Sequence, residues 1–121
     1  MTPSPRPLSR GLRDERGAGA VLALALVMAV VTIGLSGVGL AAALTARQRV
    51  IGTADLAALA AADAASGAIA GVPCDVAAGV AAANRARLTE CETDSLVVSV
   101  TVVGSFAGIP IEAQSRAGPP R

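Results

Sequence analysis

The chain has 121 residues and a formal net charge of +1. All ten cations are arginines scattered along the sequence, which argues against a nucleic-acid partner, because nucleic-acid binding needs a clustered basic face. The sequence contains no histidine, so it lacks an imidazole base, a Ser-His-Asp triad and a Cys-His pair. Two cysteines without histidine cannot complete a tetrahedral zinc site, and we expect neither an enzyme nor a cofactor.

The N-terminal third of the chain predicts a membrane span. Residues 1–16 are rich in proline and arginine and predict a disordered cytoplasmic leader. The thirty residues from Gly17 to Ala46 carry no formal charge. A bilayer core needs about 20 apolar residues, so residues 17–46 predict a transmembrane helix surrounded by membrane lipid. A signal peptide is the alternative; its apolar region is normally about 7–15 residues, but the small residues near Ala46 leave removal of the segment open.

The arginines on the two sides of this run predict its orientation. Four precede it and two follow it closely, which places the N-terminus in the cytoplasm and the rest of the chain outside; these six are Arg6, Arg10, Arg13, Arg16, Arg47 and Arg49. The second half of the run also contains a cluster of small residues. This cluster is compatible with a helix-packing seam, a local bend or plain lipid-facing sequence; its members are Gly34, Ser36, Gly37 and Gly39.

Residues 47–118 predict an extracytoplasmic helix followed by a small head. The helix continues as an alanine-rich segment to Ala70 and ends at Gly67 and Gly71-Val72-Pro73, a Gly-then-Pro stop. Four residues of this helix recur at the spacing of a single helix face and are expected to be buried, and two aspartates lie off that face. The four residues are Val50, Ala54, Ala57 and Ala61, and the aspartates are Asp55 and Asp63.

A second helix is predicted from Asp75 to Thr89, with the Asp75 carboxylate capping free amide groups at its start. Its amphipathic pattern is weak, with an apolar face formed by Val76, Val80 and Ala83.

The acidic segment that follows, 90–94, is interpreted as a solvated turn. Its three carboxylates, on Glu90, Glu92 and Asp94, are too few on a short turn for a calcium site.

The C-terminal region predicts a β-hairpin. Residues 96–103 are β-branched and alternating, 104–108 form a turn, and 109–114 alternate again with Pro110 marking an edge strand. A hairpin alone is marginal in water, so it must pack on the long helix. Residues 119–121 are a disordered tail. The predicted fold class is α+β, a long N-terminal transmembrane helix followed by a head with a second helix and a hairpin.

Cys74 and Cys91 frame the predicted second helix. In an oxidising compartment they are expected to form a disulfide. Such a bond stabilises by about 3 kcal/mol for a loop of about 15 residues, which matters for a core built largely from alanine. The alternative is a pair of free thiols that behave as small hydrophobic side chains.

Two segments carry a resemblance to a known family. The junction 14–21 (DERGAGAV) resembles the start of TadE-like pseudopilins of the tight-adherence (Flp) pilus system, and 49–62 (RVIGTADLAALAAA) is similar to a segment common in TadE- and TadG-like proteins. The short length, the paired cysteines and the closing Ser115–Pro119 are most similar to small actinobacterial TadE-like proteins encoded beside secretion genes. The resemblance covers most of residues 13–118.

The resemblance implies a pilin-like fold and a minor pilin or pseudopilin of a Tad-type pilus or secretion system. It implies cleavage by a prepilin peptidase between Gly17 and Ala18, and other pilin-like subunits or Tad assembly proteins as partners. The chain departs from the family at Leu22, where a glutamate is common; a glutamate in such a helix is costly and usually functional.

Two further possibilities remain open from the sequence. The chain is alternatively an uncleaved bitopic protein whose small head binds a partner, or a small secreted disulfide protein released by signal peptidase. The N-terminus of the mature protein distinguishes them: Ala18 for the pseudopilin, Met1 or Thr2 for the anchor, and a residue near Arg47 for the secreted protein.

Overall fold

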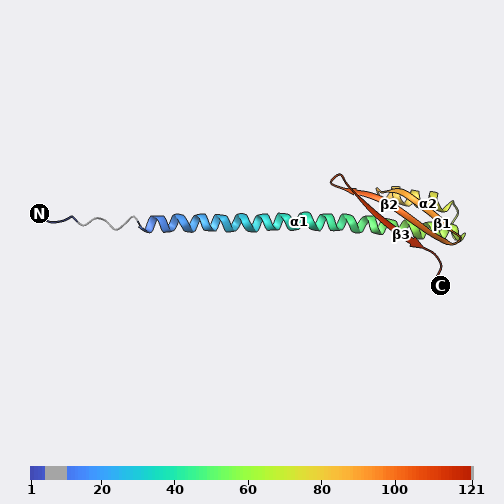
Figure 1. The fold of residues 1–121 in the computed structure, drawn as a ribbon, viewed down its shortest axis with the longest axis horizontal. Helices are drawn as coiled ribbons and strands as arrows, with labels where there is room; N and C mark the ends of the chain where they lie inside the picture. Colours follow the sequence, from blue (N-terminus) through green and yellow to red (C-terminus); the bar gives the residue numbers. More distant parts are fainter. Residues whose placement is uncertain (5–10, 121) are drawn as a thin grey trace. The chain divides into compact units, whose positions relative to one another are not determined.

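The computed structural model describes residues 1–4 and 11–120, without the side chains of residues 11–14. The predicted α+β class is confirmed, with a three-stranded sheet in place of a hairpin. The chain forms two compact units, Met1–Leu40 and Ala41–Arg121, and the first helix belongs to both. The elements in chain order are α1 (Gly11–Ala65), α2 (Pro73–Ala83), β1 (Arg87–Asp94), β2 (Val97–Phe106) and β3 (Ile109–Ala117) (Figure 1).

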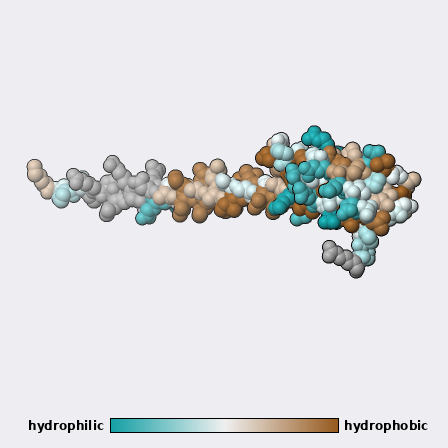
Figure 2. All heavy atoms as spheres, turned by 45° about the vertical axis from the view of Figure 1, so that its right-hand side comes forward, coloured by the Kyte–Doolittle hydropathy of each residue, from teal (hydrophilic) through white to brown (hydrophobic). Residues whose placement is uncertain are grey.

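The first unit contains the N-terminal part of α1, which begins at Gly11 and not at Gly17 as predicted. Residues 5–10 of the predicted leader, and the side chain of Arg13, lie outside the described part of the chain. Every large hydrophobic side chain from Val21 to Leu44 is exposed, and the visible face of this part of the helix is mostly hydrophobic (Figure 2). By length and composition, α1 is the one helix of the described chain that can cross a membrane.

The polar side chains within this apolar stretch are satisfied inside the helix. The Thr32 hydroxyl donates to the Met28 carbonyl at 2.7 Å, and the Ser36 hydroxyl donates to the Thr32 carbonyl at 2.8 Å. Such bonds suit a helix in lipid, where no water is available to a free hydroxyl. The helix also continues without interruption through the cluster of small residues at 34–39.

In the second unit, the four residues of α1 that were expected to be buried are buried. Val50 is 7% exposed, and Ala54, Ala57 and Ala61 are fully buried. Ala58 and Thr53 are buried beside them, while the aspartates at 55 and 63 are exposed. Because alanine projects only one methyl group, this face lets the neighbouring elements approach the helix closely.

The first helix ends at Ala65, five residues before the predicted Ala70, and the second helix also differs from its prediction. After α1 ends at Ala65, Gly67 adopts a left-handed φ of +79°. Helix α2 covers Pro73–Ala83 and not 75–89, and its N-cap is Val72. Asp75 lies in the first turn without capping, since no side-chain hydrogen bond caps this helix.

The buried face of α2 was also predicted wrongly. Ala77 and Ala81 are buried, whereas Val76 and Val80 are only half-buried and Ala83 is exposed. The two alanines belong to the same hydrophobic cluster as the buried face of α1. Small residues therefore form the contact face of both helices.

The sheet has three antiparallel strands in the order β1-β2-β3. The segment predicted as an acidic turn is part of β1, and the turn follows it at Ser95, where φ is +56°. The register of β1 shifts between Leu88 and Glu90. This bulge brings Leu88 and Cys91 onto one face, opposite Val102 and Val100, although an unbroken strand puts positions three apart on opposite faces.

Strand β2 is the predicted strand, extended at its C-terminal end. Val98, Val100 and Val102 are buried against the helices, as the alternation indicated. The strand continues to Phe106, so the turn is Ala107-Gly108 and not the whole of 104–108. Both turn residues have positive φ, +50° and +78°, which matches the twist of a tight hairpin.

Strand β3 pairs with β2 alone and is an edge strand, as Pro110 indicated. Ala113 is buried, and its neighbours on the strand, 112 and 114, are exposed. Residues 118–120 of the predicted tail have no regular structure, and Arg121 lies outside the described residues.

Helix α1 and the sheet approach each other closely at Gly104. A Cβ atom built on Gly104 would lie 2.5 Å from the Val50 Cγ2 atom. Val50 is buried, and a valine in a helix strongly prefers one rotamer, so the methyl group has little freedom to move away. Glycine at 104 is therefore required by the packing of helix on strand.

We predict that Gly104→Ala lowers the free energy of unfolding by about 1–3 kcal/mol, because the added methyl group overpacks this contact. Thermal or denaturant unfolding of the full chain in detergent, followed by circular dichroism, measures the effect. The double variant Gly104→Ala/Val50→Ala should recover part of the loss, giving a favourable coupling in a double-mutant cycle. Strictly additive effects of the two substitutions would contradict the proposed contact.

Candidate functional site

The residues singled out from the sequence lie in different units of the chain. Gly17, Ala18 and Leu22 are exposed residues of α1 in the unit Met1–Leu40, whereas the cysteines belong to the unit Ala41–Arg121. The predicted processing site and the predicted disulfide are therefore not parts of one site.

Cys74 and Cys91 form the predicted disulfide, with a Cα–Cα distance of 5.9 Å. The bond joins the first turn of α2 to the middle of β1. It fixes the helix over β1, which contributes no fully buried hydrophobic side chain to the core. Its place identifies it as a structural link.

The acidic residues of β1 form no metal-binding group among the described residues. Glu90 and Glu92 lie on the sheet face opposite the helices, where they pair with Thr101 and Ser99. The Thr101 hydroxyl donates to Glu90 Oε2 at 3.0 Å. This carboxylate is therefore held by a strand neighbour and exposed to solvent.

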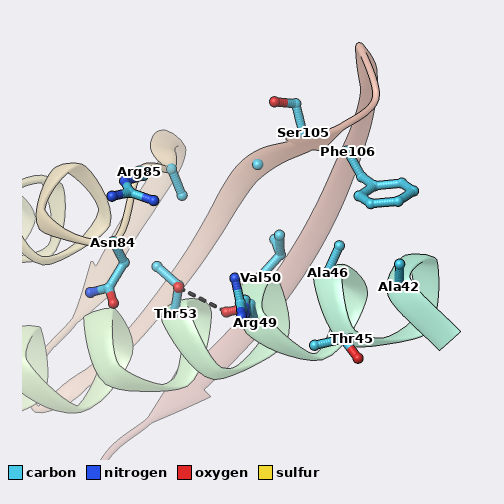
Figure 3. A pocket seen from close by; sticks show the side chains of 12 residues that line it. Ala42, Thr45, Ala46, Arg49, Val50, Thr53, Asn84, Arg85, Ser105 and Phe106 are labelled. Atoms are coloured by element: carbon cyan, nitrogen blue, oxygen red, sulfur yellow. Dashed lines mark hydrogen bonds between the residues drawn. The ribbon is translucent and has the colours of Figure 1, made fainter. Parts of the chain in front are cut away.

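A groove of about 470 Å³ lies where α1, the end of α2 and the end of β2 meet (Figure 3). Helix α1 contributes one wall, the segment Asn84–Ala86 a second, and Gly104–Phe106 the third. The α1 wall consists of Ala42, Thr45, Ala46, Arg49, Val50 and Thr53. We call this feature the arginine groove, since Arg49 and Arg85 line it.

Of the residues that the structure describes, Arg49 and Arg85 are the charged ones that line the arginine groove. A second hollow of about 410 Å³ shares Arg49, Thr53, Asn84 and Arg85 with it, so both arginines border two hollows. The neighbouring polar groups are already engaged: Thr53 Oγ1 donates to the Arg49 carbonyl at 2.8 Å, and Asn84 Nδ2 donates to the Val80 carbonyl at 2.9 Å. The guanidinium groups are thus the principal charged donors that the groove offers a ligand.

Arg85 occupies a position that usually belongs to glycine. Its φ is +58°, and it follows the C-cap Asn84 of α2. The Ala86 amide donates to the Ala81 carbonyl at 2.9 Å, and the Arg85 amide donates to the Ala82 carbonyl at 3.1 Å. These two bonds form a Schellman motif, whose left-handed residue is most often glycine because a side chain there is strained.

The arginine groove was not predicted from the sequence. Arg49, Arg85 and Phe106 are far apart in the chain, and only the end of β2 and the tight end of α2 bring them together. Two signals were available: the arginines directly after the uncharged run, and the fact that Phe106 is the one aromatic residue of the chain. Cations on a concave surface without carboxylates fit an anionic ligand, since a guanidinium matches carboxylate and phosphate geometry.

Comparison with known protein families, with curated proteins and with solved structures finds no match to this chain.

We predict that Cys74→Ser/Cys91→Ser lowers the free energy of unfolding of the full chain by about 3 kcal/mol, since the disulfide restricts the unfolded state. Unfolding in detergent with and without reductant measures this effect. Reductant should lower the Tm of the wild-type protein and leave that of the double variant unchanged. A wild-type Tm that does not respond to complete reduction would contradict a stabilising bond.

Proposed function

We propose that this chain is a single-pass, pilin-like membrane subunit that serves as a structural or assembly component of a Tad-type pilus or secretion system. The observation that carries the proposal is helix α1. Its N-terminal part exposes a continuous apolar surface, and its C-terminal part packs an alanine face under an antiparallel sheet. A subunit that resides in a bilayer and displays a small head outside it needs both properties in one helix.

The exposed side chains of α1 support a role in assembly with similar subunits. Beyond the uncharged run, Leu56 and Leu59 are 54% and 57% exposed, although they belong to the part of the helix that packs under the sheet. The helix therefore has apolar residues on its free side in both units. In the proposed role these residues contact membrane lipid first and neighbouring pilin-like subunits or Tad assembly proteins after assembly.

The proposed processing site fits this role in one respect. Gly17 and Gly19 flank Ala18, and each glycine weakens a helix by about 1 kcal/mol relative to alanine. A prepilin peptidase needs an extended backbone, so the helix must open locally around Gly17. Local unfolding here has a small free-energy cost, because glycine is a weak helix former and the site lies near the start of α1, where helices fray readily.

A second candidate function is an uncleaved bitopic anchor whose head binds a partner. Two observations favour it. Helix α1 continues from Gly11 through the proposed cleavage site, and Leu22, where the family commonly has a glutamate, is 62% exposed as an ordinary lipid-facing residue. In both candidates the positive-inside rule places the N-terminus in the cytoplasm and the head outside.

The two candidates make different predictions for the N-terminus of the protein in its native cell. For the pseudopilin we predict that N-terminal sequencing of membrane-extracted protein finds Ala18. Gly17→Val should leave the chain uncleaved, because the added valine side chain would not fit where the peptidase accepts a glycine before the cut. Mass spectrometry of the intact protein measures both outcomes.

Gly34→Val is the matched control, because Gly34 lies on the same helix away from the proposed cut and a side chain at either glycine meets no atom within 4 Å. This control should be cleaved like the wild type. An intact Met1 or Thr2 in the wild-type protein would support the anchor instead. A terminus near Arg47 would show release by signal peptidase and would exclude both candidates.

A further inference from the structure

The arginine groove includes the end of the uncharged run. Ala42, Thr45 and Ala46 belong to the run Gly17–Ala46 and also line the groove. Thirty helical residues rise by roughly 45 Å, which is close to the thickness of a bilayer with its headgroup regions. If α1 spans a bilayer, the last residues of the run lie among the headgroups and the groove opens at the membrane surface.

The β2–β3 turn brings apolar side chains to the same level. Phe106 lines the groove together with Ala42 and extends from the end of β2 toward α1 (Figure 3). Beyond the turn, Ile109 is 65% exposed, and Ala107 is exposed as well. An exposed apolar turn beside the chain's one aromatic residue is unfavourable in water and favourable at the boundary of headgroups and acyl chains.

The arginines lie on the water side of this apolar turn. Arg49 follows Ala46 on α1 by less than one helical turn, and Arg85 faces it from the end of α2. Among the described residues no carboxylate lines the groove, so the formal charge of its lining is positive. A planar guanidinium binds phosphate oxygens with paired hydrogen bonds, and its more apolar stem tolerates the membrane boundary.

Arg85 lines the groove together with Arg49, although it takes the left-handed position after α2 where glycine would be unstrained. Ser95 and Ala107 have the same backbone conformation in their turns. This conformation therefore accounts for the end of α2, and the feature that points to an anionic ligand is the pair of guanidinium groups that line the groove.

From these observations we infer that the arginine groove binds the phosphate of an anionic phospholipid while the β2–β3 turn inserts into the interface. The bound lipid and the inserted turn together fix the depth and tilt of the head at the membrane surface. The inference requires only that α1 spans a bilayer, and it holds whether or not the chain is cleaved at Gly17. Its failure is therefore distinguishable from failure of the proposed function.

The first test measures insertion of the turn. The chain has no tryptophan or tyrosine, so Phe106→Trp creates a unique fluorophore. We expect full-length Phe106→Trp in nanodiscs of phosphatidylcholine and phosphatidylglycerol to emit at short wavelength and to be quenched by lipids brominated near the top of their acyl chains. The control is Leu96→Trp in the β1–β2 turn, at the opposite end of β2 and 44% exposed. Equal quenching of the two variants would overturn the inference.

The second test measures the lipid. Full-length protein is extracted from vesicles with equal amounts of the two lipids, and the ratio of co-purified phosphatidylglycerol to phosphatidylcholine is determined. We expect Arg49→Gln and Arg85→Gln each to lower this ratio by about fivefold, since an arginine near an anionic surface contributes about 1 kcal/mol. Arg116→Gln, on the opposite face of the sheet, is the charge-matched control and should retain the wild-type ratio.

Arg85→Gly separates ligand binding from folding. This variant removes the strain at the end of α2, so we expect its Tm to rise while the lipid ratio falls as in Arg85→Gln. Excess inorganic phosphate should leave the wild-type ratio unchanged. Displacement of the lipid by free phosphate, an unchanged ratio in Arg85→Gly, or an equal loss in Arg116→Gln would each overturn the assignment to a phospholipid.

Discussion

Close approach between helix α1 and strand β2 is the constraint on which the head depends. The largest fully buried side chains of the described chain are Val98 and Val102, and burying a valine stabilises by only about 1.5–3 kcal/mol. Small side chains must therefore lie in tight contact if such a core is to be sufficient. Alanines on α1 and α2, and Gly104 on β2, allow that contact because none has a branched side chain to separate the layers.

The two parts of helix α1 differ in composition. Leucine, isoleucine and valine are exposed along the uncharged run, where contact with lipid does not penalise them. From residue 50 on, four of the six buried positions of α1 are alanine, and the other two are Val50 and Thr53. The change from bulky to small apolar residues coincides with the arginine groove, so the end of the uncharged run, Arg49 and the start of the packed core lie within a few residues of one another on α1.

The features that local sequence patterns mark clearly could be predicted from the sequence. The buried face of α1, strands β2 and β3 and the Cys74–Cys91 pair followed from helical spacing, β-branched alternation and cysteine count. Strand β1 was missed because it is polar and its bulge at Thr89 breaks the alternation that marks a strand. The extent of α2 was overestimated because its end is set by the left-handed Arg85, a residue type that gives no stop signal. The groove depends on contacts between distant segments, which no local pattern contains.

The disulfide also determines how mechanical force would pass through the head. A pull between the membrane end of α1 and the C-terminus travels along the backbone to Cys74, crosses the sulfur bridge and continues from Cys91. The backbone between the two cysteines, which includes nearly all of α2, is bypassed and bears no tension. The contact between α1 and the sheet has no covalent link of this kind and depends on packing alone. Tension would therefore separate α1 from the sheet while α2 stays fastened to β1, so the head would yield by peeling from its stalk before it unravels.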